Sequence, residues 1–173
     1  MKMNLTSKIY FVFVPCALCL AFLLDACNYK FKDVSIPADV KTVKVNYIEN
    51  KASYVNPQIS QRLSDRLRQK IVSQTRLTQT NSDNANWIIS GFITDYSITT
   101  SAITEKREAV NRLTVSVRIT LDDRVQEKIQ DYDVSKSLEF SATLSRHEAE
   151  AQLGDEMVRA LVDEIFNRIF SNW

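Results

Sequence analysis

The sequence predicts an α+β fold, a two-layer sandwich in which two helices pack on one face of a four-stranded mixed β-sheet. Three segments alternate between apolar and polar residues, a fourth is rich in β-branched and aromatic residues, and two longer segments repeat their apolar residues with a helical period. Their order is β-α-β-β-β-α. The first helix therefore crosses over between two strands that should be parallel, and the later strands can form antiparallel hairpins.

The first strand and first helix come from residues 40–74. Residues 40–47 alternate, and the inward positions are Val43, Val45 and Tyr47. Asn56 can cap a following helix, with Pro57 at the first helical position. One face of this helix carries an apolar residue every four positions, namely Ile59, Leu63, Leu67 and Ile71. The polar residues 75–86 predict a loop.

Three further strands follow this loop. Residues 87–99 are partly apolar on both faces, as in a central strand, and Gly91 suggests a bulge or a close approach by a neighbour. Residues 112–121 alternate most regularly, with Leu113, Val115, Val117, Ile119 and Leu121 pointing inward. After a charged turn at 122–128, residues 132–144 alternate through Val134, Leu138, Phe140 and Ala142.

The last predicted element is a long helix that runs to Asn172 and Trp173. Ser145 and Glu148 have the S-x-x-E spacing of a capping box. A wide apolar face follows, made of Leu153, Met157, Val158, Leu161, Val162, Ile165, Phe166 and Ile169.

Residues 1–26 have the layout of a secretory signal peptide. Lys2 and Lys8 precede an uncharged run of sixteen residues, 9–24. A helix of that length spans roughly 24 Å, short of the ~30 Å hydrocarbon core, which disfavours a transmembrane anchor. Leu24, Ala26 and Cys27 match the lipoprotein cleavage motif, whereas Asp25 departs from it. We expect cleavage before Cys27.

Cys27 is the expected lipidation site. Of the three cysteines, Cys16 and Cys19 lie in the signal segment, so residues 27–173 keep one thiol and no possible internal disulfide. A thioether to diacylglycerol explains a single cysteine in an exported protein, and two or three acyl chains anchor it stably. We expect residues 27–39 to form a lipidated tether and residues 40–173 to form one domain.

The composition argues against several classes of function. Residues 27–173 carry twenty basic and twenty acidic side chains, so nothing favours nucleic-acid binding. The single histidine, His147, is expected to be exposed in the first turn of the last helix, and no metal-ligand or nucleophile motif occurs. The pairs Asp122–Asp123 and Asp155–Glu156 are interpreted as solvated charges. We expect no enzyme activity, no cofactor and no metal.

Two basic groups remain as candidate binding residues. One lies on or just after the first helix and is interpreted as a solvated face; its members are Arg62, Arg66, Arg68, Lys70 and Arg76. The other consists of Lys106, Arg107 and Arg112, in and beside the loop between the second and third strands. Lysine and arginine pair well with phosphates, so this loop could contact an anionic lipid headgroup, although Glu105 and Glu108 dilute its charge.

These segments, taken in order, resemble the LptE family of lipopolysaccharide-assembly lipoproteins in the form found in Bacteroidota. The resemblance rests on SIPADVKTVKVNY, VNPQIS, SQTRLT, SGFITDY, AVNRLTVSV and the terminal FSNW, over ~130 residues. It implies a Gram-negative outer-membrane lipoprotein that carries acyl chains such as palmitate and faces the periplasm. It also implies a plug inside the LptD β-barrel that helps the barrel assemble and lipopolysaccharide reach the surface.

Only Cys27 transfers firmly from the family to a residue of this chain. The segment directly after it contains no acidic cluster, in agreement with a protein that faces the periplasm. Two alternatives stay open: a carrier that holds a lipid between sheet and helices, and a pilotin or scaffold for another envelope machine.

Overall fold

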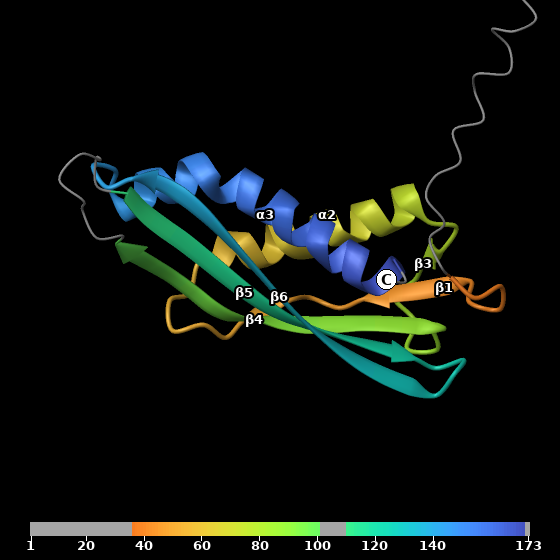
Figure 1. Cartoon of the computed structure of the whole chain (residues 1–173). Coiled ribbons are helices and arrows are strands. Elements are labelled where there is room, and N and C mark those ends of the chain that lie inside the picture. The colour runs from red at the N-terminus through yellow and green to blue at the C-terminus, as the bar shows by residue number, and fades with distance from the viewer. Residues whose placement is uncertain (1–35, 101–109, 172–173) are drawn as a thin grey trace, which may run out of the picture. The chain divides into compact units, whose positions relative to one another are not determined.

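The computed structural model describes residues 36–100 and 110–171 of the chain. Its elements are β1 (Thr42–Val45), β2 (Glu49–Asn50), α2 (Pro57–Gln74), β3 (Thr78–Gln79), β4 (Trp87–Thr100), β5 (Val110–Asp123), β6 (Lys128–Ser141) and α3 (Arg146–Phe170). Both helices lie on the same face of a single mixed sheet (Figure 1). The predicted α+β class and the two-layer arrangement are confirmed.

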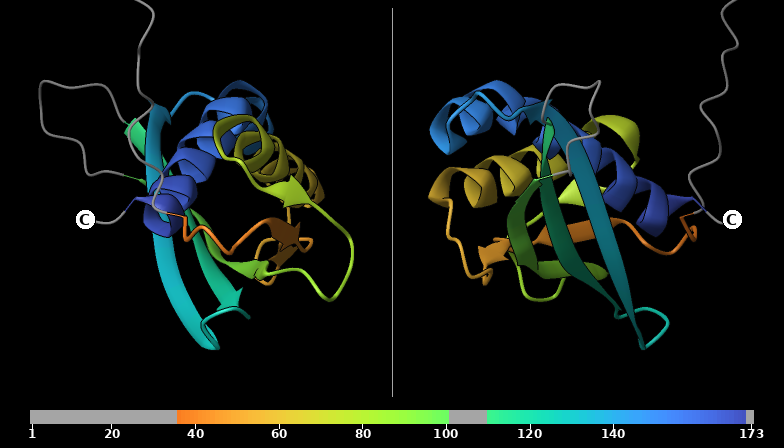
Figure 2. Two further views of the ribbon diagram at one scale, coloured as in Figure 1. Left: turned by 90° about the vertical axis from the view of Figure 1, so that its right-hand side faces the viewer. Right: turned by 60° about the vertical axis from the view of Figure 1, so that its left-hand side comes forward.

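The strand pairing agrees with the predicted topology. The strands run in the order β3-β1-β4-β5-β6, and β2 pairs with another part of β4. β1 and β4 are parallel, with α2 as the crossover between them, and β4–β5–β6 form two antiparallel hairpins (Figure 2). α3 then returns across the sheet and packs on α2 and β6.

The predicted number of four strands is wrong, because the described residues form six. The additional strands, Glu49–Asn50 and Thr78–Gln79, are two residues long and polar. They join the sheet only through backbone pairing to β4 and β1. Two residues cannot show an alternating pattern, so the sequence carries no signal for them, and β3 lies in the segment predicted as a loop.

The first strand is also shorter than predicted, and after it a different residue from the predicted one points toward the core. β1 ends at Val45, and Tyr47 is 51% exposed, whereas Ile48 is fully buried. The Ile48 amide donates to Ser64 Oγ on α2 at 2.9 Å, which turns the chain inward three residues after Val45. The prediction that Tyr47 faces the core is therefore wrong.

The β5–β6 hairpin is tighter than predicted. Both strands extend into the segment expected to be a turn, so only residues 124–127 separate them. Asp123, predicted to be solvated, is 5% exposed and accepts hydrogen bonds from the amides of Val125 and Gln126. This local bonding of an Asp side chain to the turn backbone explains its burial.

Both predicted helix starts and both apolar faces are confirmed. Asn56 accepts a hydrogen bond from the Gln58 amide, and Ser145 and Glu148 form the reciprocal capping box. The predicted apolar residues of α2 and α3 are buried in one core with the inward residues of β5. Residues 172 and 173, expected at the end of the last helix, lie outside the described part of the chain.

Gly91 permits a close approach between β4 and β5. A Cβ at this position would lie 2.5 Å from the backbone oxygen of Arg118 and 2.7 Å from Ile119 Cδ1. The predicted close approach is confirmed, whereas the strand irregularity falls between Ile93 and Asp95. A bulge there shifts the side-chain alternation, so Trp87, Ile89 and Ile93 face the core before it, and Tyr96 faces the core after it.

Candidate functional site

The two helices run parallel, so their N-termini lie at the same end of the helical layer. Ion pairs join Arg62 to Asp155 at 3.3 Å and Lys70 to Asp163 at 2.6 Å. The second pair comes eight positions after the first on both helices, as parallel helices require. Both helices begin at the left in Figure 1. After α2 the chain passes through the three long antiparallel strands β4, β5 and β6, and it returns to the end of the sheet at which α2 began.

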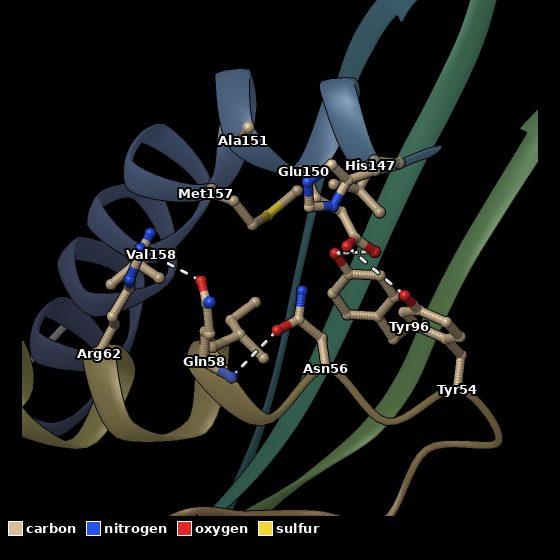
Figure 3. A pocket seen from close by; sticks show the side chains of 13 residues that line it. Tyr54, Asn56, Gln58, Arg62, Tyr96, His147, Glu150, Ala151, Met157 and Val158 are labelled. Atoms are coloured by element: carbon tan, nitrogen blue, oxygen red, sulfur yellow. Dashed lines mark hydrogen bonds between the residues drawn. The ribbon is translucent and has the colours of Figure 1, made fainter. Parts of the chain in front are cut away.

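A pocket of about 370 Å³ opens between these N-termini. Its apolar lining comes from both helices and β5, and includes Ile59, Leu113, Met157 and Val158. Its polar lining consists of Tyr54, Asn56, Gln58, Arg62, Tyr96, His147 and Glu150 (Figure 3). A volume of this size is within the range of small-ligand sites.

Two tyrosines and one glutamate form the polar end of the pocket. Tyr96 Oη donates to Glu150 Oε1 at 3.1 Å, and Tyr54 Oη donates to Glu150 Oε2 at 3.5 Å (Figure 3). The two phenol rings lie 5.3 Å apart between centroids, and the Arg146 guanidinium lies 4.3 Å from the Tyr54 centroid. The carboxylate is therefore oriented from two sides by neutral donors.

The Tyr96 hydroxyl stays protonated well beyond neutral pH. Burial raises the pKa of Tyr96, the negative charge of Glu150 raises it further, and a hydrogen bond with Asn56 lowers it to a smaller extent. Tyr96 is only 3% exposed, so its side chain is held by the core as well as by Glu150. It acts here as a fixed hydrogen-bond donor.

Small residues on α3 keep the pocket open between the helices. Ala151 and Gly154 line it on the α3 side. A Cβ added at Gly154 would meet only Arg62 Nη1, at 3.5 Å, which is ordinary van der Waals contact. Gly91 is required by backbone packing, whereas no neighbouring atom requires a glycine at position 154.

The chemistry of the pocket suits binding. It offers one carboxylate, two phenols, an imidazole and a guanidinium over an apolar floor. Across residues 36–100 and 110–171, no group of three His, Cys, Asp or Glu side chains is placed to hold a metal ion. The same ranges contain no helix long and apolar enough to cross a membrane.

Of the candidate residues from the sequence that the structure describes, Arg62 lines this pocket and Arg112 does not. Cys27, Lys106 and Arg107 are outside the described residues. Arg112 is on β5, 48% exposed, and pairs with Glu139 on β6 at 2.7 Å. Because side chains alternate along a strand, Arg112 lies on the outer face of the sheet while its neighbour Leu113 lines the pocket.

Several basic residues on or just after α2 have structural partners that a simple solvated face would lack. Lys70 pairs with Asp163, and Arg68 Nε donates to the backbone oxygen of Val45 at 3.2 Å. Arg76 donates to the backbone oxygens of Ile36 and Pro37, each at 2.7 Å. These three cations attach α2 to α3, to β1 and to the segment that leads into the domain.

Sequence patterns did not reveal the residues at the polar end of the pocket. Tyr96 faces inward only because of the bulge after Ile93, and a bulge in a strand of this composition has no clear sequence signal. Tyr54 lies in a loop, and Glu150 looks like one of several solvated acids of α3. The proline and capping signals did correctly mark the two helix starts that surround the pocket.

Comparison with known proteins gives one family match. The model of the family described as "LptE: Lipopolysaccharide-assembly" matches residues 40–169, most of the chain and nearly all of the described domain. A search of curated proteins finds no significant match.

Several solved structures share the fold. A neuraminyllactose-binding hemagglutinin homologue from Helicobacter pylori has a TM-score of 0.56 at 10% identity and covers 83% of this chain and 90% of its own. An uncharacterized lipoprotein B from Nitrosomonas europaea has a TM-score of 0.50 at 18% identity, and the match covers 83% of this chain and 91% of that protein. PelC from Paraburkholderia phytofirmans, a dodecamer, has a TM-score of 0.50 at 12% identity, and the match covers 82% of this chain and 96% of the PelC chain. Identities this low show a common fold and carry no function to this chain.

Proposed function

The chain belongs to the LptE family of lipopolysaccharide-assembly lipoproteins, and from this membership we propose that it is the plug and assembly partner of the LptD β-barrel in the outer membrane. The family is non-enzymatic and acts in the cell envelope. The observation that carries the proposal is the match over residues 40–169, because it spans every strand and nearly all of both helices.

The outer face of the sheet supports a position inside a barrel. Its cross-strand neighbours bond to one another in rows: Thr114 with Ser137, Ser116 with Ser135, Arg118 with Asp133 and Thr120 with Asp131, all between 2.6 and 2.9 Å. The interior of an outer-membrane barrel is polar. Arg118 and Asp133 are already paired on this face, so this part of it can lie against such a wall without leaving either charge unpaired.

The N-terminal segment completes the proposal. We propose that residues 1–26 are removed as a signal peptide, that Cys27 is acylated, and that the tether to residue 39 holds the domain at the periplasmic side of the outer membrane. In the same proposal, Lys106 and Arg107 contact lipopolysaccharide phosphates, since both are cations and they are adjacent in the segment between β4 and β5.

The decisive experiment is purification of the full-length protein from its own membranes in mild detergent. We expect a large outer-membrane β-barrel to co-purify and to be identified as LptD by mass spectrometry. Isolation of the lipoprotein alone would contradict the proposal. A bound lipid released on denaturation, without a barrel, would favour a lipid carrier, and a different envelope complex would favour a scaffold.

Two variants test the anchor and the loop separately. Cys27→Ala should accumulate as uncleaved precursor without acyl label, and normal labelling would place the site elsewhere. Reversal of charge in Lys106→Glu with Arg107→Glu should weaken lipopolysaccharide binding at an unchanged melting temperature. Unchanged binding would exclude this segment, and the double variant Lys128→Glu with Arg159→Glu, which changes the net charge equally at two exposed positions, is the control.

A further inference from the structure

Glu150 is the one half-buried acidic residue of α3 that has no ion pair within the described residues; Glu156 also has none there, but it is exposed. Asp155, Asp163 and Glu164 each pair with a lysine or arginine on a neighbouring element, and Glu148 caps its own helix. Within the described residues, no ion pair reaches the Glu150 carboxylate, whose partners are the hydroxyls of Tyr54 and Tyr96. Neutral donors orient a carboxylate without cancelling its charge.

The surroundings of Glu150 suit a cation. The rings of Tyr54 and Tyr96 stand beside the carboxylate, and an aromatic face attracts a guanidinium or ammonium group. Arg146, which lies 4.3 Å from the Tyr54 centroid, shows that this ring already accepts one guanidinium. Arg62, which lines the pocket, is engaged with Asp155 and Gln58.

The rest of the pocket suits an aliphatic stem. Met157, Val158 and Leu113 supply an apolar floor next to the polar end. Lysine and arginine side chains lay their methylene groups on apolar surface and extend the charged group to a polar partner. A volume of about 370 Å³ has room for one such side chain.

Gly154 gives independent support. A glycine inside a helix costs about 1 kcal/mol relative to alanine. A Cβ here would be accommodated, so internal packing does not account for this residue. Its effect is to keep the space beside Arg62 and Met157 open.

From this geometry we infer that the pocket between the N-termini of α2 and α3 receives a lysine or arginine side chain of a partner protein, with Glu150 as its counter-charge. Arginine anchors in pockets are frequent at protein–protein interfaces. The inference rests on the proposed function only in requiring a protein partner, whatever that partner is.

The test uses a methyl probe inside the pocket. The full chain contains three methionines, Met1, Met3 and Met157, so methyl-¹³C methionine labelling gives Met157 its own NMR signal. We would titrate the full-length protein in detergent with N-acetyl-arginine methylamide, N-acetyl-lysine methylamide and the uncharged isostere N-acetyl-citrulline methylamide.

The expected result is a saturable shift of the Met157 signal with arginine or lysine derivatives and no shift with citrulline. Glu150→Gln should weaken this binding about tenfold or more, because it removes a charge-assisted bond. Glu156→Gln, an exposed acid on the same helix, should leave it unchanged. Near-ultraviolet circular dichroism of each variant confirms that the domain remains folded.

Three results would overturn the inference. They are no shift with either basic derivative, an equal shift with citrulline, or a shift produced instead by inorganic phosphate or by phosphatidylethanolamine vesicles. Binding of arginine by a protein that co-purifies with no barrel would keep this inference and remove the proposed function, so the two fail separately.

Discussion

Tyr96 Oη donates a hydrogen bond to Glu150 Oε1 at 3.1 Å, and this contact joins a long central strand to the first turns of α3 across 54 positions of sequence. Tyr54, in the loop before α2, donates to the other oxygen of the same carboxylate at 3.5 Å. One side chain thus connects the sheet, the loop and the helical layer at the open end of the pocket.

Removal of the Tyr96 hydroxyl should destabilise the domain. Tyr96→Phe takes away a hydrogen bond to a charged group, which is worth about 1.5–3 kcal/mol, and keeps the buried ring. Urea unfolding should show that the free energy of unfolding falls by about this amount. Tyr47→Phe, at an exposed tyrosine, should stay within about 0.5 kcal/mol of the parent, and an equal loss in both variants would contradict the prediction.

Gly91→Ala should be destabilising. Its Cβ would lie 2.5 Å from a backbone oxygen of β5, so the two strands must separate locally. Overpacking of this kind costs about 1–3 kcal/mol. Thermal unfolding should therefore show a lower melting temperature, and an unchanged value would mean that the strands adjust without strain.

Gly154→Ala should behave in the opposite way. Because the added methyl group meets only Arg62 Nη1 at 3.5 Å, we expect stability to rise by up to about 1 kcal/mol through higher helix propensity. Chemical denaturation measures the change. A loss of stability would show that the glycine is required by packing.

Glu164 should make stability depend on acid pH. Hydrogen bonds from Lys136 and Arg168 hold the pKa of Glu164 below its ordinary value of 4.5. An acid whose pKa is lowered by folding stabilises the protein above the unfolded pKa, and this stabilisation is lost as the pH falls from 4.5 through the folded value.

A double-mutant cycle of Glu164→Gln with Lys136→Met measures this effect. The coupling free energy between the two residues should be constant near neutral pH and should decline below about pH 4.5. A coupling that does not change with pH would show that the carboxylate is not held ionised by Lys136.

The N-cap of α3 should also contribute measurably. Ser145→Ala removes the acceptor for the Glu148 amide and one half of the capping box, so unfolding free energy should fall by about 0.5–2 kcal/mol. Ser145→Asp, which retains a capping oxygen, should restore most of the loss. A similar loss in both variants would point to a different cause.

Most of the fold was predictable because its main elements are long and have one buried face. The four-residue repeat of Ile59, Leu63, Leu67 and Ile71 requires a helix, and the alternation from Leu113 to Leu121 requires a strand. The two-residue strands could not be predicted, since their pairing uses backbone groups and leaves no side-chain pattern.

The sequence by itself determined the fold class, the helix starts at Asn56 and Ser145, the parallel crossover and the resemblance to a lipopolysaccharide-assembly family. Each of these follows from local patterns or from their order along the chain. Only the tertiary structure decided the pocket. Tyr54, Tyr96 and Glu150 come from a loop, a strand and a helix, and they meet because a bulge turns Tyr96 inward and because two parallel helices begin at the same end of the sheet. Local residue patterns carry no information about such long-range placement.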